Sequence, residues 1–272
     1  MPALSRRVEA LPRTGSFSVW AGPTTGDAWL TAEPDLPHYA ASTMKLALVM
    51  AAYREAELGR LDLDEVVTVH NEHRSALDGR PYSIDRAEDS DPEPWTRLGT
   101  PVALRWLAYR AIVRSSNLAT NLLLDAVGTS PVEVLLRDAG ATGSVVCRGI
   151  EDHRARDAGF HNVVTARDLS AQLQALVSAS LLSRSGSAEI LAVLAAQQVN
   201  DAIPARLPPG TRVAHKSGWM PGVSHDAGIV DAGDGSPFIF VMCTTSPLDE
   251  HAALGLIADA AAAAYADRRA RA

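Results

Sequence analysis

The sequence has few cysteines, no hydrophobic run of membrane length and no excess of positive charge, and each shortage excludes a class of protein. Its two cysteines, Cys147 and Cys243, are far apart and form no Cys-x-x-Cys spacing, so we expect buried thiols and no metal site. The Ala-rich stretch 258–266 is too short to cross a bilayer. With 25 basic and 32 acidic residues, the net charge of −7 argues against a nucleic-acid partner or an anionic-membrane surface.

The beginning of the chain also lacks a feature of exported proteins. Arg6 and Arg7 are not followed by the apolar run and small-residue cleavage site of a secretory signal. The chain as written is therefore expected to be cytoplasmic, and a secreted mature form with its leader removed stays an alternative. We expect a monomer that acts on a small molecule.

The composition is that of a globular protein. An apolar fraction of 47% in 272 residues is enough for one substantial core, or for two lobes that share a cleft. The segments with strand-like patterning lie near both ends, at 16–22, 27–32, 212–217, 227–230 and 238–244. Helical patterning fills the middle, at 41–58, 102–113, 118–127, 132–139, 166–178 and 187–197, with an extended loop at 71–99.

Two sequence signals predict where helices begin. Thr100 before Pro101 is typical of an N-cap followed by a first-turn proline, and Ser246 to Asp249 has the form of a capping box that opens a terminal helix. That helix is expected to end near Arg268, Arg269 and Arg271, where cations favour the helix dipole.

This order of elements predicts an α/β (α+β) fold. Both termini contribute strands to one antiparallel sheet with flanking helices, and an all-helical lobe is inserted between them. We expect a single domain, with a sheet lobe at about 1–45 and 205–272 and a helical lobe at about 46–204.

Ser42 and Lys45 form the first candidate for chemistry, at the start of the predicted helix 41–58. Residues three apart share a helix face, so the Lys45 amine can reach the Ser42 hydroxyl. A desolvated lysine with a lowered pKa can take the proton of a serine, and the helix N-terminus supplies amide donors for an oxyanion. Taken alone, the pair also fits a surface lysine and an N-cap serine.

Two further polar motifs follow. Ser115 and Asn117 lie between two predicted helices, where a hydroxyl can relay a proton and an amide can fix a substrate carbonyl; capping of the next helix is the alternative. The third motif, Lys216-Ser217-Gly218-Trp219, ends a predicted strand. There Lys216 and Ser217 can bind a carboxylate, and Gly218 leaves room for a substrate at the strand edge.

These three motifs, in this order, resemble the signature of class A β-lactamases and penicillin-binding proteins. The resemblance extends from about Ser16 to the C-terminus and implies a β-lactamase/transpeptidase-like serine hydrolase without a cofactor. It implies that Ser42 is acylated, that Lys45 is its base or proton relay, and that Ser115 passes a proton to the leaving nitrogen. Asn117 would hold the acylamide of the substrate, and the backbone N–H groups of Ser42 and Trp219 would form the oxyanion hole.

The sequence departs from class A enzymes where they carry the glutamate that activates water. Here Arg148 is followed by Glu151 one residue late, so Glu151 is a displaced candidate base, or else a surface Glu–Asp pair or a partner for Arg154 or Arg156. Ser116 replaces an aspartate of the second motif. Ser224 stands near the place of an arginine that assists carboxylate binding. His153, His215 and His225 are expected at the surface or behind the site.

Three functions stay open on the sequence alone. The leading one is hydrolysis of β-lactams or related amide and ester bonds through an acyl-enzyme. An esterase or D-alanyl-D-alanine peptidase on the same fold is the close alternative. A penicillin sensor that is acylated without turnover belongs to another class, and the altered loop around Glu151 keeps it in view.

Overall fold

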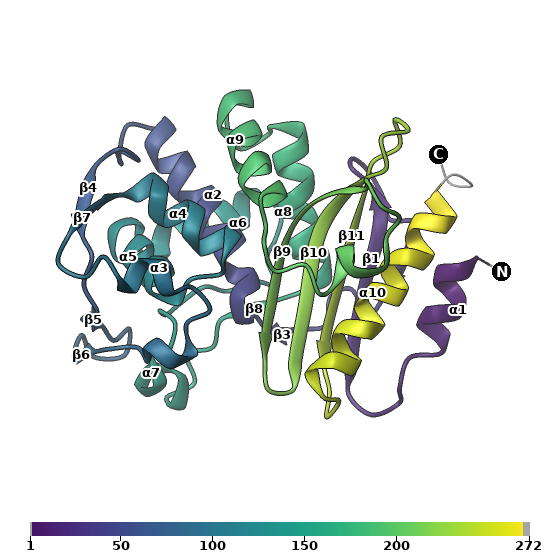
Figure 1. Cartoon of the computed structure of the whole chain (residues 1–272), viewed down its shortest axis with the longest axis horizontal. Coiled ribbons are helices and arrows are strands. Elements are labelled where there is room, and N and C mark those ends of the chain that lie inside the picture. Colours follow the sequence, from purple (N-terminus) through teal and green to yellow (C-terminus); the bar gives the residue numbers. More distant parts are fainter. Residues whose placement is uncertain (1, 269–272) are drawn as a thin grey trace.

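The computed structural model describes residues 2–268 and consists of a five-stranded antiparallel sheet with helices on both faces (Figure 1). The strands are ordered β2-β1-β11-β10-β9 across the sheet. Their bounds are β1 Ser16–Pro23, β2 Leu30–Ala32, β9 Arg212–Met220, β10 Val223–Asp231 and β11 Phe238–Thr245. Because β1 pairs along its whole length with β11, the two ends of the chain complete one sheet, as the sequence predicts.

Short strand pairs tie the loops together outside this sheet. They are β3 His38–Tyr39 with β8 Val163–Val164, β4 Val66–Thr68 with β7 Pro101–Ala103, and β5 His73–Arg74 with β6 Pro81–Tyr82. The first of these pairs joins the segment just before Ser42 to the segment after Glu151, and both segments border the site described below.

Helices make up most of the middle of the chain. The α-helices are α1 Ala3–Glu9, α2 Met44–Glu57, α3 Pro92–Trp95, α4 Leu104–Val113, α5 Asn117–Val127, α6 Thr129–Asp138, α7 His153–Asp157, α8 Ala166–Ser178, α9 Arg184–Ala195 and α10 Glu250–Asp267. Short 3₁₀ helices are η1 Ala41–Thr43, η2 Arg86–Glu88 and η3 Ile203–Arg206.

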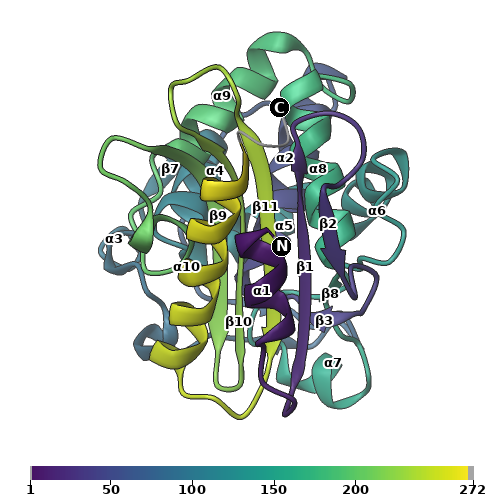
Figure 2. The ribbon, with the colours of Figure 1, turned by 90° about the vertical axis from the view of Figure 1, so that its right-hand side faces the viewer.

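The sheet separates two hydrophobic cores because successive side chains of a strand point to opposite faces. In β11, Phe238, Phe240 and Met242 pack under α1 and α10, which cover one face (Figure 2). Ile239 and Val241 point the other way, into the larger core that includes α2, α4, α5, α8 and α9. Strands buried on both faces read as continuous apolar runs, which is why this one was recognisable from the sequence.

Two predicted helix starts are wrong. Thr100 does not cap α4, because Pro101–Ala103 pairs as a strand with β4 and the helix begins at Leu104. Ser246 does not open α10, because the side chain of Asp249 accepts the amide of Ala252 and the helix begins at Glu250. At Thr100, strand pairing overrode the local capping pattern. At Ser246, a second start signal nearby, Asp249, caps the helix instead.

Several smaller differences separate prediction from structure. Helix α1 was not predicted, the segment 71–99 holds short strands and turns as well as loop, and β2 is shorter than the predicted 27–32. Arg269 and Arg271, the predicted end of the last helix, lie outside the described residues. Cys243 is buried as expected, whereas Cys147 is half-buried, and both are free thiols. No helix within residues 2–268 has the length and apolar character that crossing a membrane requires.

Candidate active site

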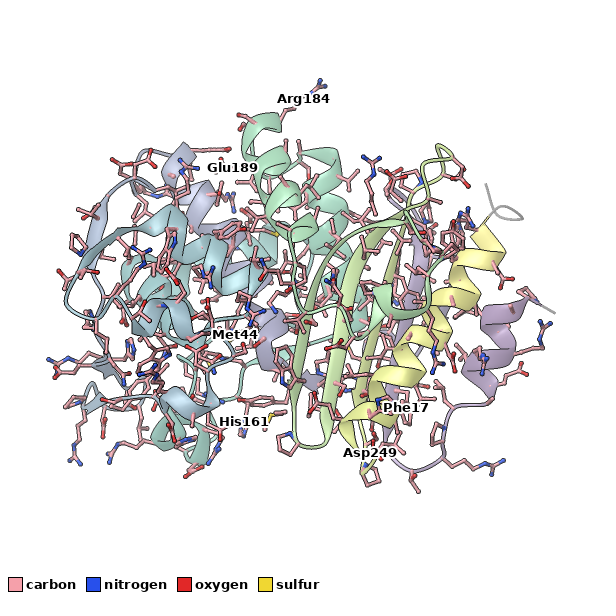
Figure 3. All side chains as sticks on the ribbon, viewed as in Figure 1. Phe17, Met44, His161, Arg184, Glu189 and Asp249 are labelled. Carbon is pink, nitrogen blue, oxygen red and sulfur yellow. The ribbon has the colours of Figure 1, made fainter. Side chains whose placement is uncertain are left out.

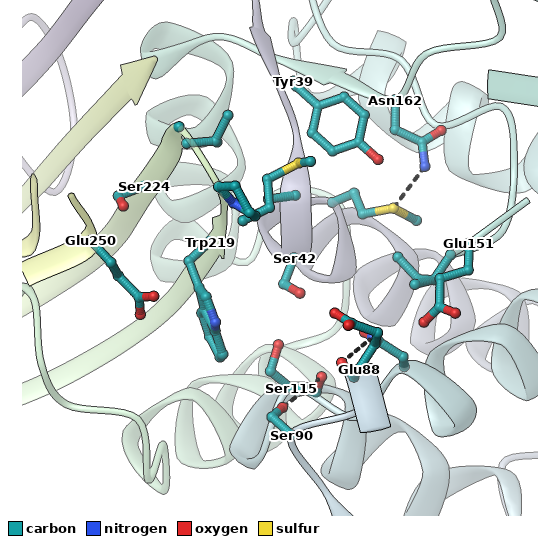
Figure 4. Close-up of a pocket in the computed structure, with 18 of the residues that line it drawn as sticks. Tyr39, Ser42, Glu88, Ser90, Ser115, Glu151, Asn162, Trp219, Ser224 and Glu250 are labelled. Carbon is teal, nitrogen blue, oxygen red and sulfur yellow. Dashed lines mark hydrogen bonds between the residues drawn. The ribbon is translucent and has the colours of Figure 1, made fainter. Parts of the chain in front are cut away.

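A cleft of about 1030 Å³ lies where β9, the edge strand of the sheet, faces the helical middle of the chain. Ser42, Ser115, Asn117, Glu151 and Trp219 line it (Figure 4). The sequence places these residues far apart, so the fold brings the three motifs to one cavity. A volume of this size is typical of a small-molecule site.

Ser42 lies in η1, immediately before α2, at the meeting point of helix and sheet. Ala41 has a positive φ of 43°, a strained conformation for a residue with a Cβ that is commonly found at functional sites. Gly218 of β9 passes directly beneath, since a Cβ there would lie 2.8 Å from Ser42 N and 2.9 Å from Thr43 N. Gly218 is therefore required by the approach of β9 to the Ser42 backbone, which is a different reason from the room for substrate that the sequence suggested.

Lys45 is fully buried one turn into α2. Its Nζ donates to Ser115 O at 2.7 Å and to Asn117 Oδ1 at 2.9 Å, with longer bonds to Ser115 Oγ and Ser116 O at 3.4 Å. Burial lowers the pKa of Lys45 to about 7, and the carboxylates of Asp89, Asp91 and Glu151 act against that shift. A lysine with a pKa near neutrality can accept a proton in the range where the enzyme works.

Ser115 stands between two lysines. Its Oγ accepts from Lys216 Nζ at 3.0 Å and from Lys45 Nζ at 3.4 Å, so both lone pairs of the hydroxyl have donors. The hydroxyl proton then remains to be given to a third group in the cleft. Ser115 has a φ of 57°, and the turn that it makes is followed by α5, whose N-cap is Ser116 and whose first residue is Asn117.

The third motif lies on β9. Lys216 is fully buried, and burial together with the charge of Lys45 lowers its pKa well below the ordinary value. The hydroxyl oxygen of Ser217 is buried and has no hydrogen-bond partner within residues 2–268. An unpaired buried hydroxyl is costly, and a polar substrate group at this edge would satisfy it.

Glu151 lies across the cleft from Ser224 and Glu250, on the loop between Arg148 and α7 (Figure 4). Its Oε2 accepts the amide of Asp85 at 2.7 Å, while Oε1 is buried and has no partner in the described part of the chain. Burial raises the pKa of Glu151.

The sequence left two structural alternatives for Glu151, and both are wrong. Arg154 pairs with Asp78, and Arg156 pairs with Asp157. Asp152 is buried and caps α7, so it forms no surface pair with Glu151.

Neighbouring elements hold this loop from two sides. Asn121 of α5 accepts the amide of Ile150 at 2.7 Å and donates to its carbonyl at 3.0 Å. Arg148 donates to the Tyr39 hydroxyl at 2.6 Å and to Phe160 O at 2.8 Å. Asn162 accepts the backbone amide of Arg148 and donates to its carbonyl. The same side chain contacts the sulfur of Met44, a residue in the interior of the protein (Figures 3 and 4).

The three histidines divide as the sequence suggested. His153 is exposed at the rim of the cleft. His215 is buried behind Lys216, where it bonds Asp226 and Asn200. His225 is also buried: its Nδ1 accepts the amide of Thr244 and its Nε2 therefore donates to the carbonyl of Tyr39, as a neutral ring does.

Several residues of the site could not be found from the motifs. Tyr39, Glu88, Asp89 and Ser90 line the cleft, and Asn121 lies behind it. The available signal was the acidic stretch ending in Asp91 before Pro92, which is a helix-start pattern inside the segment read as loop.

Known proteins resemble this chain over nearly its whole length. The sequence model described as the β-lactamase enzyme family matches residues 3–267. The fold is similar to the crystal structure of a β-lactamase from Sphaerobacter thermophilus, with a TM-score of 0.85 and 26% identity over 98% of this chain and 97% of that one. None of the curated proteins compared matches the chain.

Two further solved structures show the same fold. A variant of the class A β-lactamase of the last common ancestor of Gram-negative bacteria has a TM-score of 0.83 and 23% identity, covering 97% of this chain and 98% of that one. PBP-A has a TM-score of 0.83 and 20% identity, covering 98% and 96%.

Proposed function

The chain belongs to the β-lactamase enzyme family and is a serine hydrolase, and from this premise we propose that it opens β-lactams through an acyl-enzyme on Ser42. The observation that carries the proposal is that Ser42 and Ser115 line one cleft, while the buried amines of Lys45 and Lys216 both donate to Ser115 from behind it.

Acylation begins at the Ser42 hydroxyl. Its Oγ forms a bond to the carbonyl carbon of the substrate while its proton passes to the neutral amine of Lys45, whose depressed pKa makes it a base at neutral pH. The backbone N–H groups of Ser42 and Trp219 stabilise the oxyanion that forms. When the ring C–N bond breaks, Ser115 supplies the proton that the leaving nitrogen takes up, and Lys45 restores the proton of Ser115.

Substrate binding uses the two sides of the cleft. Asn117 presents its side-chain amide to the acylamide group, and Ser217 offers a hydroxyl without a partner among residues 2–268 to a carboxylate. Lys216 precedes Ser217 on β9 and donates to the backbone carbonyl of Ser217 and to the Ser115 hydroxyl. Because its pKa is depressed, binding of a carboxylate and protonation of Lys216 favour each other.

Release of the acyl group requires a water molecule, and Glu151 is the base that we assign to it. Its unpaired Oε1 can accept a proton from water, and its raised pKa brings the carboxylate closer to the range in which a general base works. The water oxygen bonds to the ester carbonyl carbon as Glu151 takes one water proton; the bond from that carbon to Ser42 Oγ then breaks, and Ser42 Oγ takes up the proton that Glu151 holds.

Turnover of a chromogenic cephalosporin by the wild-type chain and by Ser42→Ala tests the proposal. We expect hydrolysis by the wild type and loss of activity by about 10⁴-fold or more in the variant, because the nucleophile is gone. Equal rates for the two proteins would contradict the proposal. Turnover of simple esters without turnover of the cephalosporin would move the assignment to an esterase.

The family implies a small-molecule substrate. A monomeric state and the lack of a nucleic-acid partner are further proposals, which the net charge of −7 supports. Light scattering on the purified chain measures the oligomeric state, and a dimer mass would contradict the first of them. A cytoplasmic location stays a prediction.

A further inference from the structure

The segment from Glu88 to Asp91 lies against the turn that carries Ser115 and Asn117, and Asp89 makes its main contacts. One carboxylate oxygen, Oδ1, accepts the backbone amide of Asn117 at 3.0 Å. The other, Oδ2, accepts the backbone amide of Leu118 at 2.9 Å, the Ser116 hydroxyl at 3.2 Å and the indole N–H of Trp95 at 2.9 Å.

These contacts give α5 a second cap. Ser116 is its ordinary N-cap and accepts only the amide of Ala119, at 3.1 Å. The first two amides of the helix, those of Asn117 and Leu118, point instead at a carboxylate that precedes Asn117 by 28 residues. A helix N-terminus favours a negative charge, so Asp89 satisfies both the hydrogen bonds and the dipole of α5.

The residues next to Asp89 fasten the same segment to the rest of the turn. Ser90 Oγ donates to the carbonyl of Arg114 at 2.7 Å. Asp91 is fully buried and pairs with Arg110 of α4. The carbonyl of Glu88 accepts the side-chain amide of Asn117 at 3.2 Å, which fixes the orientation of that amide.

The turn held in this way carries the acceptors of Lys45. Ser115 O and Asn117 Oδ1 receive the two shortest hydrogen bonds of Lys45 Nζ. Ser115 has a positive φ, a conformation that persists only where the surroundings impose it. A displacement of the turn therefore moves the amine and the relay hydroxyl together.

We propose that Asp89 is a positioning residue for the acylation of Ser42, which holds the Ser115–Asn117 turn and, through that turn, the amine of Lys45. This inference rests on the proposed function. Asp89 touches neither the nucleophile nor the amine by a hydrogen bond in the described structure; it acts on both through the turn.

The charge of Asp89 adds an electrostatic effect to the positional one. The groups that face Lys45 are the carboxylates of Asp89, Asp91 and Glu151, which raise its pKa, and the neighbouring Lys216, which Lys45 itself perturbs. Removing the charge of Asp89 therefore lowers the pKa of Lys45 further, and a limb of the pH–rate profile that belongs to Lys45 moves to lower pH.

The variant Asp89→Asn tests the proposal. Asparagine has one acceptor oxygen, so its NH₂ group must face the amide of Asn117 or of Leu118. We expect the acylation rate to fall on the order of 100-fold, the loss that a small misplacement of catalytic groups causes. The pH–rate limb should also move to lower pH, which loss of stability alone would not produce. Glu93→Gln removes an equal charge from the exposed partner of Arg97 and should change neither quantity.

A second pair of variants restores the carboxylate from another position. Ser116 Oγ already contacts Asp89, so Ser116→Asp in the Asp89→Asn background returns a carboxylate to the same place. We expect this double variant to recover at least about tenfold of the lost rate, while Ser116→Asp alone is harmful because it sets two carboxylates together. If Asp89→Asn alone does not fold, the double variant is compared with Ser116→Asp, and the double variant should be acylated faster.

The outcomes separate this inference from the proposed function. If the wild type forms no acyl-enzyme, the proposed function fails. If the wild type is acylated and Asp89→Asn shows the same rate and the same pH profile, the role of Asp89 is overturned. A folded double variant without any recovery of rate overturns it as well.

Discussion

Burial determines the chemistry of single residues in this cleft. Lys45 and Lys216 are both fully buried and close to Ser115, and neither forms an ion pair with a carboxylate among the described residues. Burial removes the water that stabilises a protonated amine, so the neutral form is favoured and the pKa falls. The same effect acts in the opposite direction on Glu151, where burial favours the protonated acid and raises the pKa.

The lowered pKa of Lys45 predicts the pH dependence of acylation. Above about 7 the amine is neutral and accepts the Ser42 proton, and below about 7 it is protonated and does not. The acylation rate should therefore rise with pH through about 7 and level off above it. The measurement is the pre-steady-state rate of adduct formation in the wild type, by rapid mixing and mass spectrometry, because Glu151→Gln would itself lower the pKa of Lys45 by removing a nearby carboxylate.

A rate of adduct formation that stays constant between about pH 6 and about pH 8 would show that Lys45 is not the base. Lys45→Arg is the matched variant, because arginine keeps a positive charge at every accessible pH. It should be acylated at least about 100-fold more slowly across the whole range.

Among the elements, the loop from Arg148 to Asn162 carries Glu151, the base that we propose for release of the acyl group. Asn121 holds Ile150 by both of its backbone groups, and Arg148 is bound by the Tyr39 hydroxyl and the carbonyl of Phe160. Glu151 itself has a positive φ of 57°. A loop held at so many points keeps Glu151 in a conformation that a free loop would leave.

Gly149→Ala tests how far release depends on this loop. A Cβ at Gly149 would clash with the Tyr82 hydroxyl and would lie 3.0 Å from Asn121 Oδ1, so the loop or these side chains must shift. We expect release of the acyl group to slow by roughly 100-fold. Acylation should change by no more than a few-fold, since Ser42 and Lys45 belong to η1 and α2. Stopped-flow measurement of both steps checks this.

Tyr82→Phe provides the matched control. It removes the oxygen that the new Cβ would meet and loses only a 3.3 Å hydrogen bond from Asn121. The double variant Gly149→Ala/Tyr82→Phe should release the acyl group faster than Gly149→Ala alone. Equal release by the wild type and Gly149→Ala would mean that the loop position does not govern this step.

At the scale of the whole molecule, the cleft forms where the edge strand β9 faces the helical middle of the chain, and one hydrophobic core continues from that face of the sheet into the helices. The sheet is packed on both faces, and α2 extends from its edge into the helical part (Figure 1). Ser42 and Lys45 stand at the start of α2, Ser115 and Asn117 between α4 and α5, and Lys216 on β9. The site thus needs the fold as a whole.

The sequence predicted this arrangement well where a local pattern has one physical solution. The strand pattern of β1, the continuous apolar run of β11 and the helical periodicity of α8 are strong signals, and the positions of these elements agree closely with prediction. The starts of α4 and α10 were wrong, since a capping pattern at Thr100 or Ser246 competes with strand pairing or with a better cap nearby.

The site, too, could be predicted only as far as local patterns in the sequence indicate it. Ser42, Lys45, Ser115 and Lys216 were grouped because their three motifs, in this order, resemble the signature of class A β-lactamases, whereas each spacing alone also has a structural explanation. The role that we propose for Asp89 depends on a contact between residues 28 positions apart, and no local pattern encodes it. The reason for Gly218 was likewise visible only when β9 was placed against Ser42 N.

Intact-mass measurement over time with a chromogenic cephalosporin follows both steps of the proposed reaction, the acylation of Ser42 and the hydrolysis that Glu151 assists. We expect the wild type to turn over without lasting adduct, while Glu151→Gln accumulates one adduct per chain, located on Ser42 by peptide mapping. An adduct on another residue, or turnover by Glu151→Gln at the wild-type rate without accumulation, would contradict it.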